Sequence, residues 1–172
     1  ENELKLLFVS RISQKKNLHY LLQVLGKISM RTKVHLTIVG PQEDEKYVEK
    51  CRSYVDQLPN NCSASFVGAL QHNDVIHKII EHHFFILPTL GENFGHAIFE
   101  SFAVGRPVII SDQTPWKDLA YQKIGFDLPL ADTQNWVKTL EYAAGMDQET
   151  FDLWCNNAHR YAQEIINIDS LK

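Results

Sequence analysis

The chain has 172 residues, a formal net charge of −4 and a hydrophobic content of 44%. This length suits one domain, which we place over residues 1–172, and the hydrophobic content is sufficient for a buried core. Because basic residues are not in excess, the composition argues against a general binder of nucleic acids or membrane surfaces.

Strand patterns and helix patterns alternate along the chain. Short apolar runs predict buried strands at 4–10, 34–40, 65–68, 84–88, 107–111 and 126–130. Apolar residues at helical spacing predict helices at 18–28, 41–58, 75–80, 94–104, 136–144 and 148–166. This alternation predicts right-handed βαβ units, and therefore an α/β, Rossmann-like parallel sheet with helices on both faces.

The cysteines and the chain start indicate the protein's setting. Cys51, Cys62 and Cys155 form no CxxC pair, which is typical of reduced, partly buried thiols in a cytoplasmic protein. The sequence has no signal peptide and no apolar run long enough to span a bilayer. Because the chain starts at Glu1 rather than Met, we expect it to be part of a longer chain, the alternative being removal of a methionine by processing.

In a parallel α/β sheet, ligands bind beyond the carboxyl ends of the strands, so the turns after strands are the places to search. The first such turn, RISQKKN, contains Arg11, Lys15 and Lys16. These cations could clamp a diphosphate, with the arginine acting as a fork and the lysines as point charges. The alternative is a solvated basic turn, which is common in loops.

The stretch TLGENFGHAIFESFAVGRPVIISD, residues 89–112, carries Glu92 and Glu100 around the start of a predicted helix. Free amides of Asn93, Phe94 and Gly95 at that helix start would form an anion site. A diphosphate repels carboxylates, whereas sugar hydroxyls donate to them, so the two acids are predicted to bind sugars on either side of the diphosphate. The alternative is a dipole-favoured acid at position 92 and a solvated one at position 100.

Four segments resemble, in order, the motifs of one enzyme family. ENFG, followed after four residues by Glu100 and then by SFAVGRPVIIS, resembles the E-G-F-G-x4-E signature of the retaining glycosyltransferases of the GT-B fold, family 4. LLFVSRISQKKN is similar to their V-G-R-L-x-x-x-K-G motif, TIVGPQED to their next strand and loop, and FVGAL to their F-x-G-x-V segment. The resemblance covers nearly the whole chain, but only the C-terminal, donor-binding half of a GT-B enzyme.

The resemblance implies a catalytic group made of Arg11, Lys16 and Glu92. The two cations and the helix dipole would stabilise the leaving diphosphate without a metal ion or a cofactor. Glu92 would contact the transferred sugar. The sequence has no Asp-x-Asp signature, and its histidines lack metal-ligand spacing, so we expect no metal site.

Other donor contacts follow from the same resemblance. Arg11 and Lys16 would be joined by the backbone of residues 93–95 in holding the diphosphate. Glu100 would bind the ribose, and the segment from Gly68 to Leu70 would border the nucleobase.

The chain departs from the family pattern at several positions. In the motif that resembles V-G-R-L-x-x-x-K-G, Ser10 replaces the glycine before Arg11 and Asn17 replaces the glycine after Lys16. Asparagine tolerates left-handed geometry. His96 stands where an apolar residue is usual and is expected to line the site. The turn TPWKDL places Asp118 near the position of a family glutamate.

The last predicted helix, 148–166, resembles the segment that crosses to the N-terminal acceptor domain of GT-B enzymes. Since that domain has no counterpart in this sequence, Trp154 and Tyr161 are expected to face solvent. Trp116 and Trp136, by contrast, are expected in core or edge packing.

The function implied is that of a hexosyl-type transferase, inactive as this fragment alone, which moves a sugar from a nucleotide-diphosphate sugar to a sugar or lipid-linked acceptor. Polysaccharide or glycolipid biosynthesis is the setting that the family suggests, in the cytoplasm or at the inner face of the membrane. Two alternatives stay open: a sugar-nucleotide epimerase of the same architecture, and a non-catalytic α/β interaction module with a degenerate site.

Overall fold

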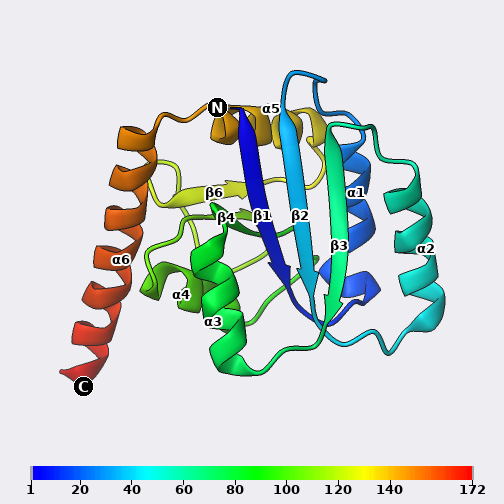
Figure 1. Ribbon diagram of the computed structural model, residues 1–172. Helices are drawn as coiled ribbons and strands as arrows, with labels where there is room; N and C mark the ends of the chain where they lie inside the picture. Colours follow the sequence, from blue (N-terminus) through cyan, green and yellow to red (C-terminus); the bar gives the residue numbers. More distant parts are fainter. Residues whose placement is uncertain (1, 172) are drawn as a thin grey trace.

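A computed structural model describes residues 2–171 and shows one six-stranded parallel sheet with helices on both sides (Figure 1). The strand order is β3-β2-β1-β4-β5-β6, and every neighbouring pair runs parallel. The strands are β1 (Glu3–Val9), β2 (Lys33–Val39), β3 (Cys62–Gly68), β4 (Phe84–Leu87), β5 (Val108–Ser111) and β6 (Gly125–Leu128). The predicted fold class is therefore confirmed.

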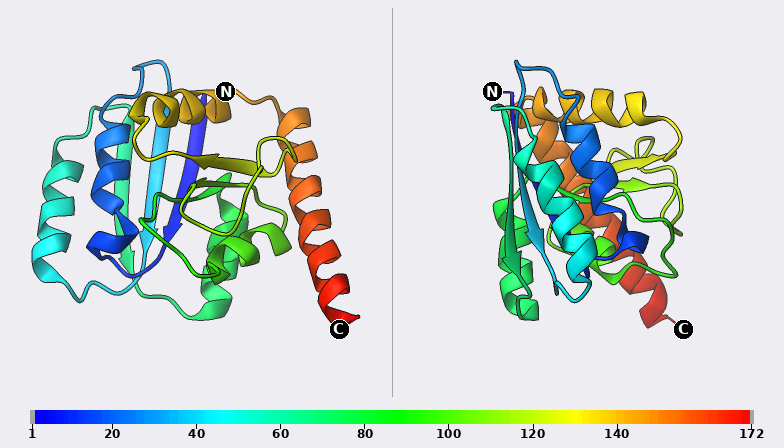
Figure 2. Two further views of the ribbon diagram at one scale, coloured as in Figure 1. Left: turned by 180° about the vertical axis from the view of Figure 1, so that it is seen from behind. Right: turned by 90° about the vertical axis from the view of Figure 1, so that its right-hand side faces the viewer.

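Six α-helices and one 3-10 turn connect these strands or follow them. The 3-10 turn is η1 (Gln14–Lys16), and the helices are α1 (Leu18–Leu25), α2 (Glu45–Asp56), α3 (His72–Glu81), α4 (His96–Ala103), α5 (Thr133–Ala144) and α6 (Gln148–Ser170). Figure 2 shows α1 and α2 on one face of the sheet and α3 on the other.

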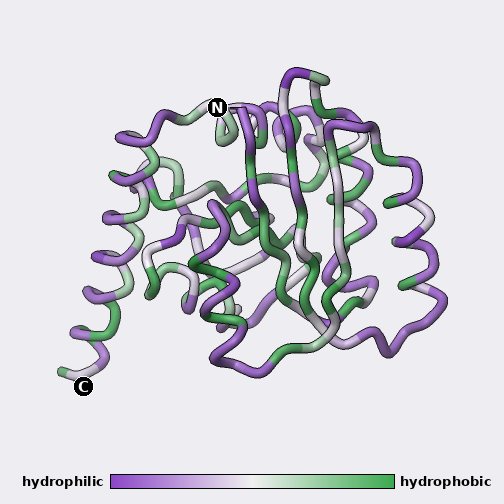
Figure 3. The backbone as a smooth tube through the Cα atoms, in the orientation of Figure 1, coloured by the Kyte–Doolittle hydropathy of each residue, from purple (hydrophilic) through white to green (hydrophobic). Residues whose placement is uncertain are grey.

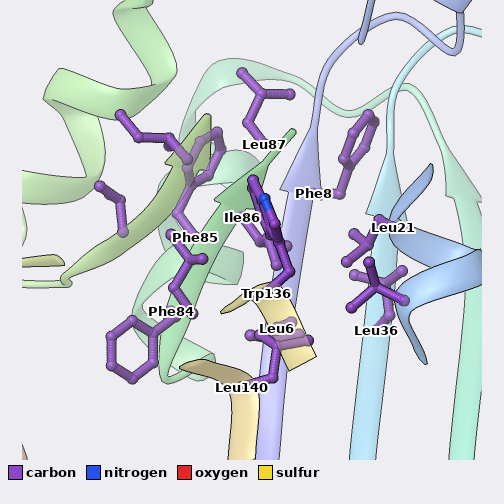
Figure 4. Packing of buried hydrophobic residues seen from close by; sticks show 14 of the residues in the cluster. Leu6, Phe8, Leu21, Leu36, Phe84, Phe85, Ile86, Leu87, Trp136 and Leu140 are labelled. Carbon is purple, nitrogen blue, oxygen red and sulfur yellow. The ribbon is translucent and has the colours of Figure 1, made fainter. Parts of the chain in front are cut away.

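The side chains of β1 explain why both faces of the sheet are covered. Leu6 and Phe8 are buried in a core shared with the helix α1, whereas Leu7 belongs to a second core with Val75 and Ile79 of α3. Because successive side chains of a strand point to opposite faces, an unbroken apolar run requires a helix layer on each side. Figure 4 shows the larger core, in which Trp136 of α5 packs near the strands.

Helix starts follow the local sequence. Asp44, within an acidic run at 43–45, caps α2 by accepting a hydrogen bond from the Tyr47 amide at 3.1 Å. The helix predicted from residue 94 begins at His96 instead, because Gly95 adopts the left-handed conformation, with φ 81°. The strand predicted at 65–68 begins earlier, at Cys62.

The expectation that Trp154 and Tyr161 face solvent is wrong for Trp154. Its side chain is only 5% exposed and lies against Phe126 of β6, with ring centroids 5.2 Å apart. Tyr161 is half-buried, 5.4 Å from the ring of Phe102 in α4. The helix α6 therefore packs on this domain itself, against β6 through Trp154 and against α4 through Tyr161.

Hydropathy follows the layers. In Figure 3 the central strands are largely hydrophobic, while the outer helices carry hydrophilic residues at helical intervals. Within residues 2–171, no helix combines the length and the apolar character needed to cross a membrane. Cys51 and Cys62 are buried free thiols and Cys155 is partly buried, as predicted.

Candidate functional site

The turns after β1 and β4 meet at one place on the carboxyl edge of the sheet, where the strand order changes direction. The chain runs from β1 outward to β2 and β3, and then returns to β4 on the other side of β1. Figure 1 shows the arrowheads of β1, β2 and β3 at this edge. Such a switch point leaves a crevice between turns that lead to opposite faces, which is where open α/β sheets bind ligands.

Two hydrogen bonds join these turns. The Leu90 amide donates to the carbonyl of Lys15 at 2.8 Å, and the Asn17 side-chain amide donates to the carbonyl of Pro88 at 3.0 Å. Asn17 is buried and left-handed, with φ 65°. Asparagine tolerates this left-handed conformation, and its side chain adds a hydrogen bond that glycine could not form.

Lys16 and Glu92 are the two predicted site residues that the structure brings into direct contact. The Lys16 ammonium donates to Oε1 of Glu92, and each side chain is only 14% exposed. Thr89, fully buried, has its hydroxyl 3.3 Å from the same carboxylate oxygen. The motifs predict that the lysine binds the diphosphate and the glutamate the sugar, whereas here each side chain is the partner of the other.

Open backbone amides lie next to this ion pair. Within residues 2–171, the amides of Asn93, Phe94 and Gly95 have no hydrogen-bond acceptor. A Cβ added at Gly95 would come within 2.8 Å of Cδ1 of Ile98, so glycine is required there both by conformation and by space. These amides lie at the N-terminus of α4, the position at which the sequence predicts an anion site.

Arg11 lies at the same edge of the sheet but contacts none of the other predicted residues. Its side chain is exposed and forms no ion pair within the described part of the chain. The backbone here passes very close to Gly40, where a Cβ would come within 1.7 Å of the Ser10 carbonyl oxygen. The end of β2 is thereby held close to Ser10, the residue before Arg11.

Glu100 forms a separate pair with a residue that the sequence reading did not connect with the site. Nε2 of His72, the first residue of α3, lies 3.0 Å from Oε1 of Glu100. The turn between β3 and α3 contains the predicted base-binding segment, in which Gly68 is left-handed with φ 78°. Leu70 is half-buried and packs on the second core.

The turn after β5 also reaches the site. Nε1 of Trp116 donates to the Phe94 carbonyl at 2.6 Å, and the indole is buried. His96 is exposed, with its ring 4.8 Å from that of Phe94. Asp118 is left-handed, and its amide lies 3.3 Å from Asp127. The TPWKDL turn therefore packs against the turn after β4 and is hydrogen-bonded to it through Trp116.

Three contributors were missed by the sequence argument: His72, Thr89 and the side chain of Asn17. Thr89 is the first residue of the 89–112 stretch, but nothing in its spacing indicates that its hydroxyl meets Glu92. His72 lies 28 positions before Glu100, and a local pattern does not detect such a pair.

Several surface hollows lie away from these residues. A hollow of about 600 Å³ lies between the starts of β1 and β4 and the turn from α5 to α6, and one of about 400 Å³ lies between α1 and α2. Neither includes Arg11, Lys16, Glu92 or Glu100. Within residues 2–171, no three His, Cys, Asp or Glu side chains are grouped as metal ligands.

Comparison with known proteins gives a family match and a fold match. The model of the family described as "Glycosyl transferases group 1" matches residues 1–143. The "Uncharacterized glycosyltransferase MJ1607" of Methanocaldococcus jannaschii is 29% identical over 112 residues, which are 64% of this chain and 28% of the relative.

Two solved structures show the same fold. Anabaena Alr3699/HepE in complex with UDP and glucose has a TM-score of 0.77 at 19% identity, covering 99% of this chain and 49% of that chain. The catalytic domain of cholesterol-alpha-glucosyltransferase from Helicobacter pylori has a TM-score of 0.74 at 16% identity, covering 94% of this chain and 98% of that chain. The chain thus spans about half of the Anabaena protein and less of the Methanocaldococcus relative.

Proposed function

Because this chain belongs to the family of glycosyl transferases group 1, we propose that it is the donor-binding half of a retaining, hexosyl-type glycosyltransferase. One observation carries the proposal. The turns after β1 and β4 are joined at the switch point, and this places Lys16, Glu92 and the open amides of residues 93–95 side by side.

In this proposal, Lys16, Arg11 and the amides of residues 93–95 receive the diphosphate of a nucleotide sugar. The bond between the anomeric carbon and the diphosphate oxygen breaks, and the electron pair leaves with the diphosphate. Cations and amide dipoles that are already in place stabilise this charge without rearrangement. The acceptor hydroxyl attacks from the same face and loses its proton to the departing phosphate oxygen.

Glu92 is proposed to exchange partners when the donor binds. The carboxylate leaves Lys16 as the diphosphate arrives and accepts hydrogen bonds from the hydroxyls of the transferred sugar. Thr89 stays within reach of the carboxylate, so the side chain remains tethered near the site.

The acceptor is proposed to be a sugar or a lipid-linked sugar held by a second domain of a longer protein. Since the carboxyl edge of the sheet would then form only one wall of a cleft between two domains, this chain alone would be inactive. Polysaccharide or glycolipid synthesis in the cytoplasm, with contact to the inner membrane face for the whole protein, is the setting that we propose.

The test is calorimetric titration of this chain with UDP, GDP and ADP. UDP is the first ligand to try, because the similar Anabaena protein was solved with UDP and with UDP-glucose. Lys16→Ala should weaken binding roughly 10- to 100-fold, the loss of a charge-assisted contact to phosphate. Lys15→Ala is the matched control, since Lys15 is an exposed lysine of the same turn and forms no ion pair with Glu92.

Binding of no nucleotide at millimolar concentration by a folded sample would contradict the proposal. Equal losses in the Lys16 and Lys15 variants would remove the specific role of Lys16 and leave only general attraction of an anion. With a longer protein that includes the acceptor domain, a transferred sugar supports the transferase, whereas an isomerised donor supports the epimerase.

A further inference from the structure

His72 and Glu100 form a side-chain pair that nothing in the known motifs requires. His72 is the first residue of α3, Glu100 lies in the middle of α4, and the two helices are in contact (Figure 1). The distance from Nε2 of His72 to Oε1 of Glu100 is 3.0 Å. The Glu100 side chain is 29% exposed and that of His72 is 68% exposed.

The chemistry of the pair fixes which atom donates. An ionised carboxylate can only accept hydrogen bonds, so Nε2 of His72 must carry the hydrogen. Oε1 of Glu100 is occupied by this bond, while Oε2 has no partner within the part of the chain that the structure describes. The pair therefore presents one fixed carboxylate oxygen to an incoming hydroxyl.

The position of the pair ties it to the nucleoside side of the proposed site. The turn before His72 is the one predicted to border the base, and the Gly40 amide holds its first residue by donating to the Gly68 carbonyl at 2.9 Å. Glu100 lies one and a half turns beyond the open amides at the start of α4, and helical side chains lean back toward that end. The pair thus links the turn between β3 and α3, which is predicted to border the base, to α4, whose open amides are proposed to bind the diphosphate.

We propose that His72 is a positioning residue that orients Glu100 toward the ribose hydroxyls, and so sets the preference of this chain for ribonucleotides over deoxyribonucleotides. This inference rests on the proposed function. A partly exposed glutamate without His72 would sample several rotamers, and ordering it would weaken ligand binding roughly 3- to 10-fold.

The experiment compares variants of this chain in calorimetric titrations with UDP, GDP and ADP and with their 2′,3′-dideoxy counterparts. His72→Ala should weaken binding of the ribonucleotide that binds the unmodified chain by about 3- to 10-fold and leave the dideoxy compound unchanged. His72→Gln should restore ribonucleotide binding, because the glutamine amide nitrogen lies the same number of bonds from Cα as Nε2. His72→Asn is too short and should behave as alanine does.

The control is His77→Ala, which removes an exposed histidine from the same helix without touching Glu100. It should leave both ligands unaffected. The inference is overturned if His72→Ala weakens the ribo and dideoxy ligands equally, or weakens neither, while Glu100→Gln still lowers ribonucleotide binding. If the unmodified chain binds no nucleotide at all, the proposed function fails and this inference fails with it.

Discussion

Removing the charge of Glu92 should make this chain bind UDP more tightly. Glu92 is paired with Lys16, and both side chains are 14% exposed, so the diphosphate must displace a resident anion before it can use the lysine. In Glu92→Gln the shape is kept and the competing charge is lost. The same change should weaken a sugar nucleotide relative to UDP, because the proposed contact with the sugar is impaired.

The magnitude follows from the burial of the pair. At an effective dielectric constant of about 20, two unit charges about 4 Å apart attract by about 4 kcal/mol, and desolvation and side-chain ordering offset much of this. A partly buried pair then contributes roughly 1–2 kcal/mol net, above the range for fully exposed pairs. Glu92→Gln frees Lys16 from this competing pair, and this should lower the UDP dissociation constant roughly 5- to 30-fold.

The assay is calorimetric titration of the unmodified chain, Glu92→Gln and Glu43→Gln with UDP and UDP-glucose. Glu43 lies in the turn after β2, is exposed, and has no contact with Lys16, so its substitution controls for the change in net charge at this edge. The reasoning is refuted if Glu92→Gln leaves UDP affinity unchanged while Lys16→Ala abolishes binding, because the lysine would then bind phosphate without competition.

Three further outcomes test the local structure. Gly95→Ala should cost roughly 1–2 kcal/mol of unfolding free energy in denaturant titrations, because position 95 has φ 81° and the new Cβ would meet Ile98 at 2.8 Å; an unchanged midpoint would refute the left-handed start of α4. Asn17→Gly should lower the free energy of unfolding by about 1 kcal/mol, because the hydrogen bond to Pro88 is lost. Asn17→Ala should lower it by about 2–3 kcal/mol, because alanine is also strained in the left-handed conformation. Equal losses in the two variants would contradict the strain at position 17. Burial lowers the pKa of His82 below the ordinary 6.5, so the unfolded state takes up the proton first as the pH falls, and this contribution to stability is complete above about pH 6.5 and declines below it. Melting temperatures at about pH 7.5 and 5.5 should therefore differ less in His82→Gln than in the unmodified chain, and an identical difference would exclude His82 as a source.

Much of the fold could be predicted because strands and helices leave local periodic signals. The six strands and six helices were all expected near their observed places, since burial on both faces makes a strand apolar throughout. Element ends were less accurate. The start of α4 depends on one backbone angle at Gly95, and β3 begins three residues before the apolar part that the pattern detected.

The candidate site shows the same division. Lys16 and Glu92 were both selected from their motifs, but their mutual pairing was not expected. They are 76 positions apart, and they meet only because β1 and β4 are neighbours in the sheet. Alternating strands and helices are compatible with several strand orders, so the pattern alone does not place these two turns together.

The prediction for Trp154 was wrong because it depended on a tertiary contact that the sequence does not show. Its expected exposure followed from the idea that α6 reaches toward another domain, yet the indole packs on Phe126 within this chain. His72 was passed over because an exposed histidine carries no local signal, and its meaning comes from α4 lying beside α3.

By itself, the sequence determined the order and type of the elements and the residues with the right chemistry at the carboxyl edge of the sheet, because periodicity and motif spacing are properties of neighbouring residues. Only the tertiary structure decided which of those residues touch. The pairs Lys16–Glu92 and His72–Glu100 form between segments far apart in the chain, and such contacts depend on how helices and strands pack in space.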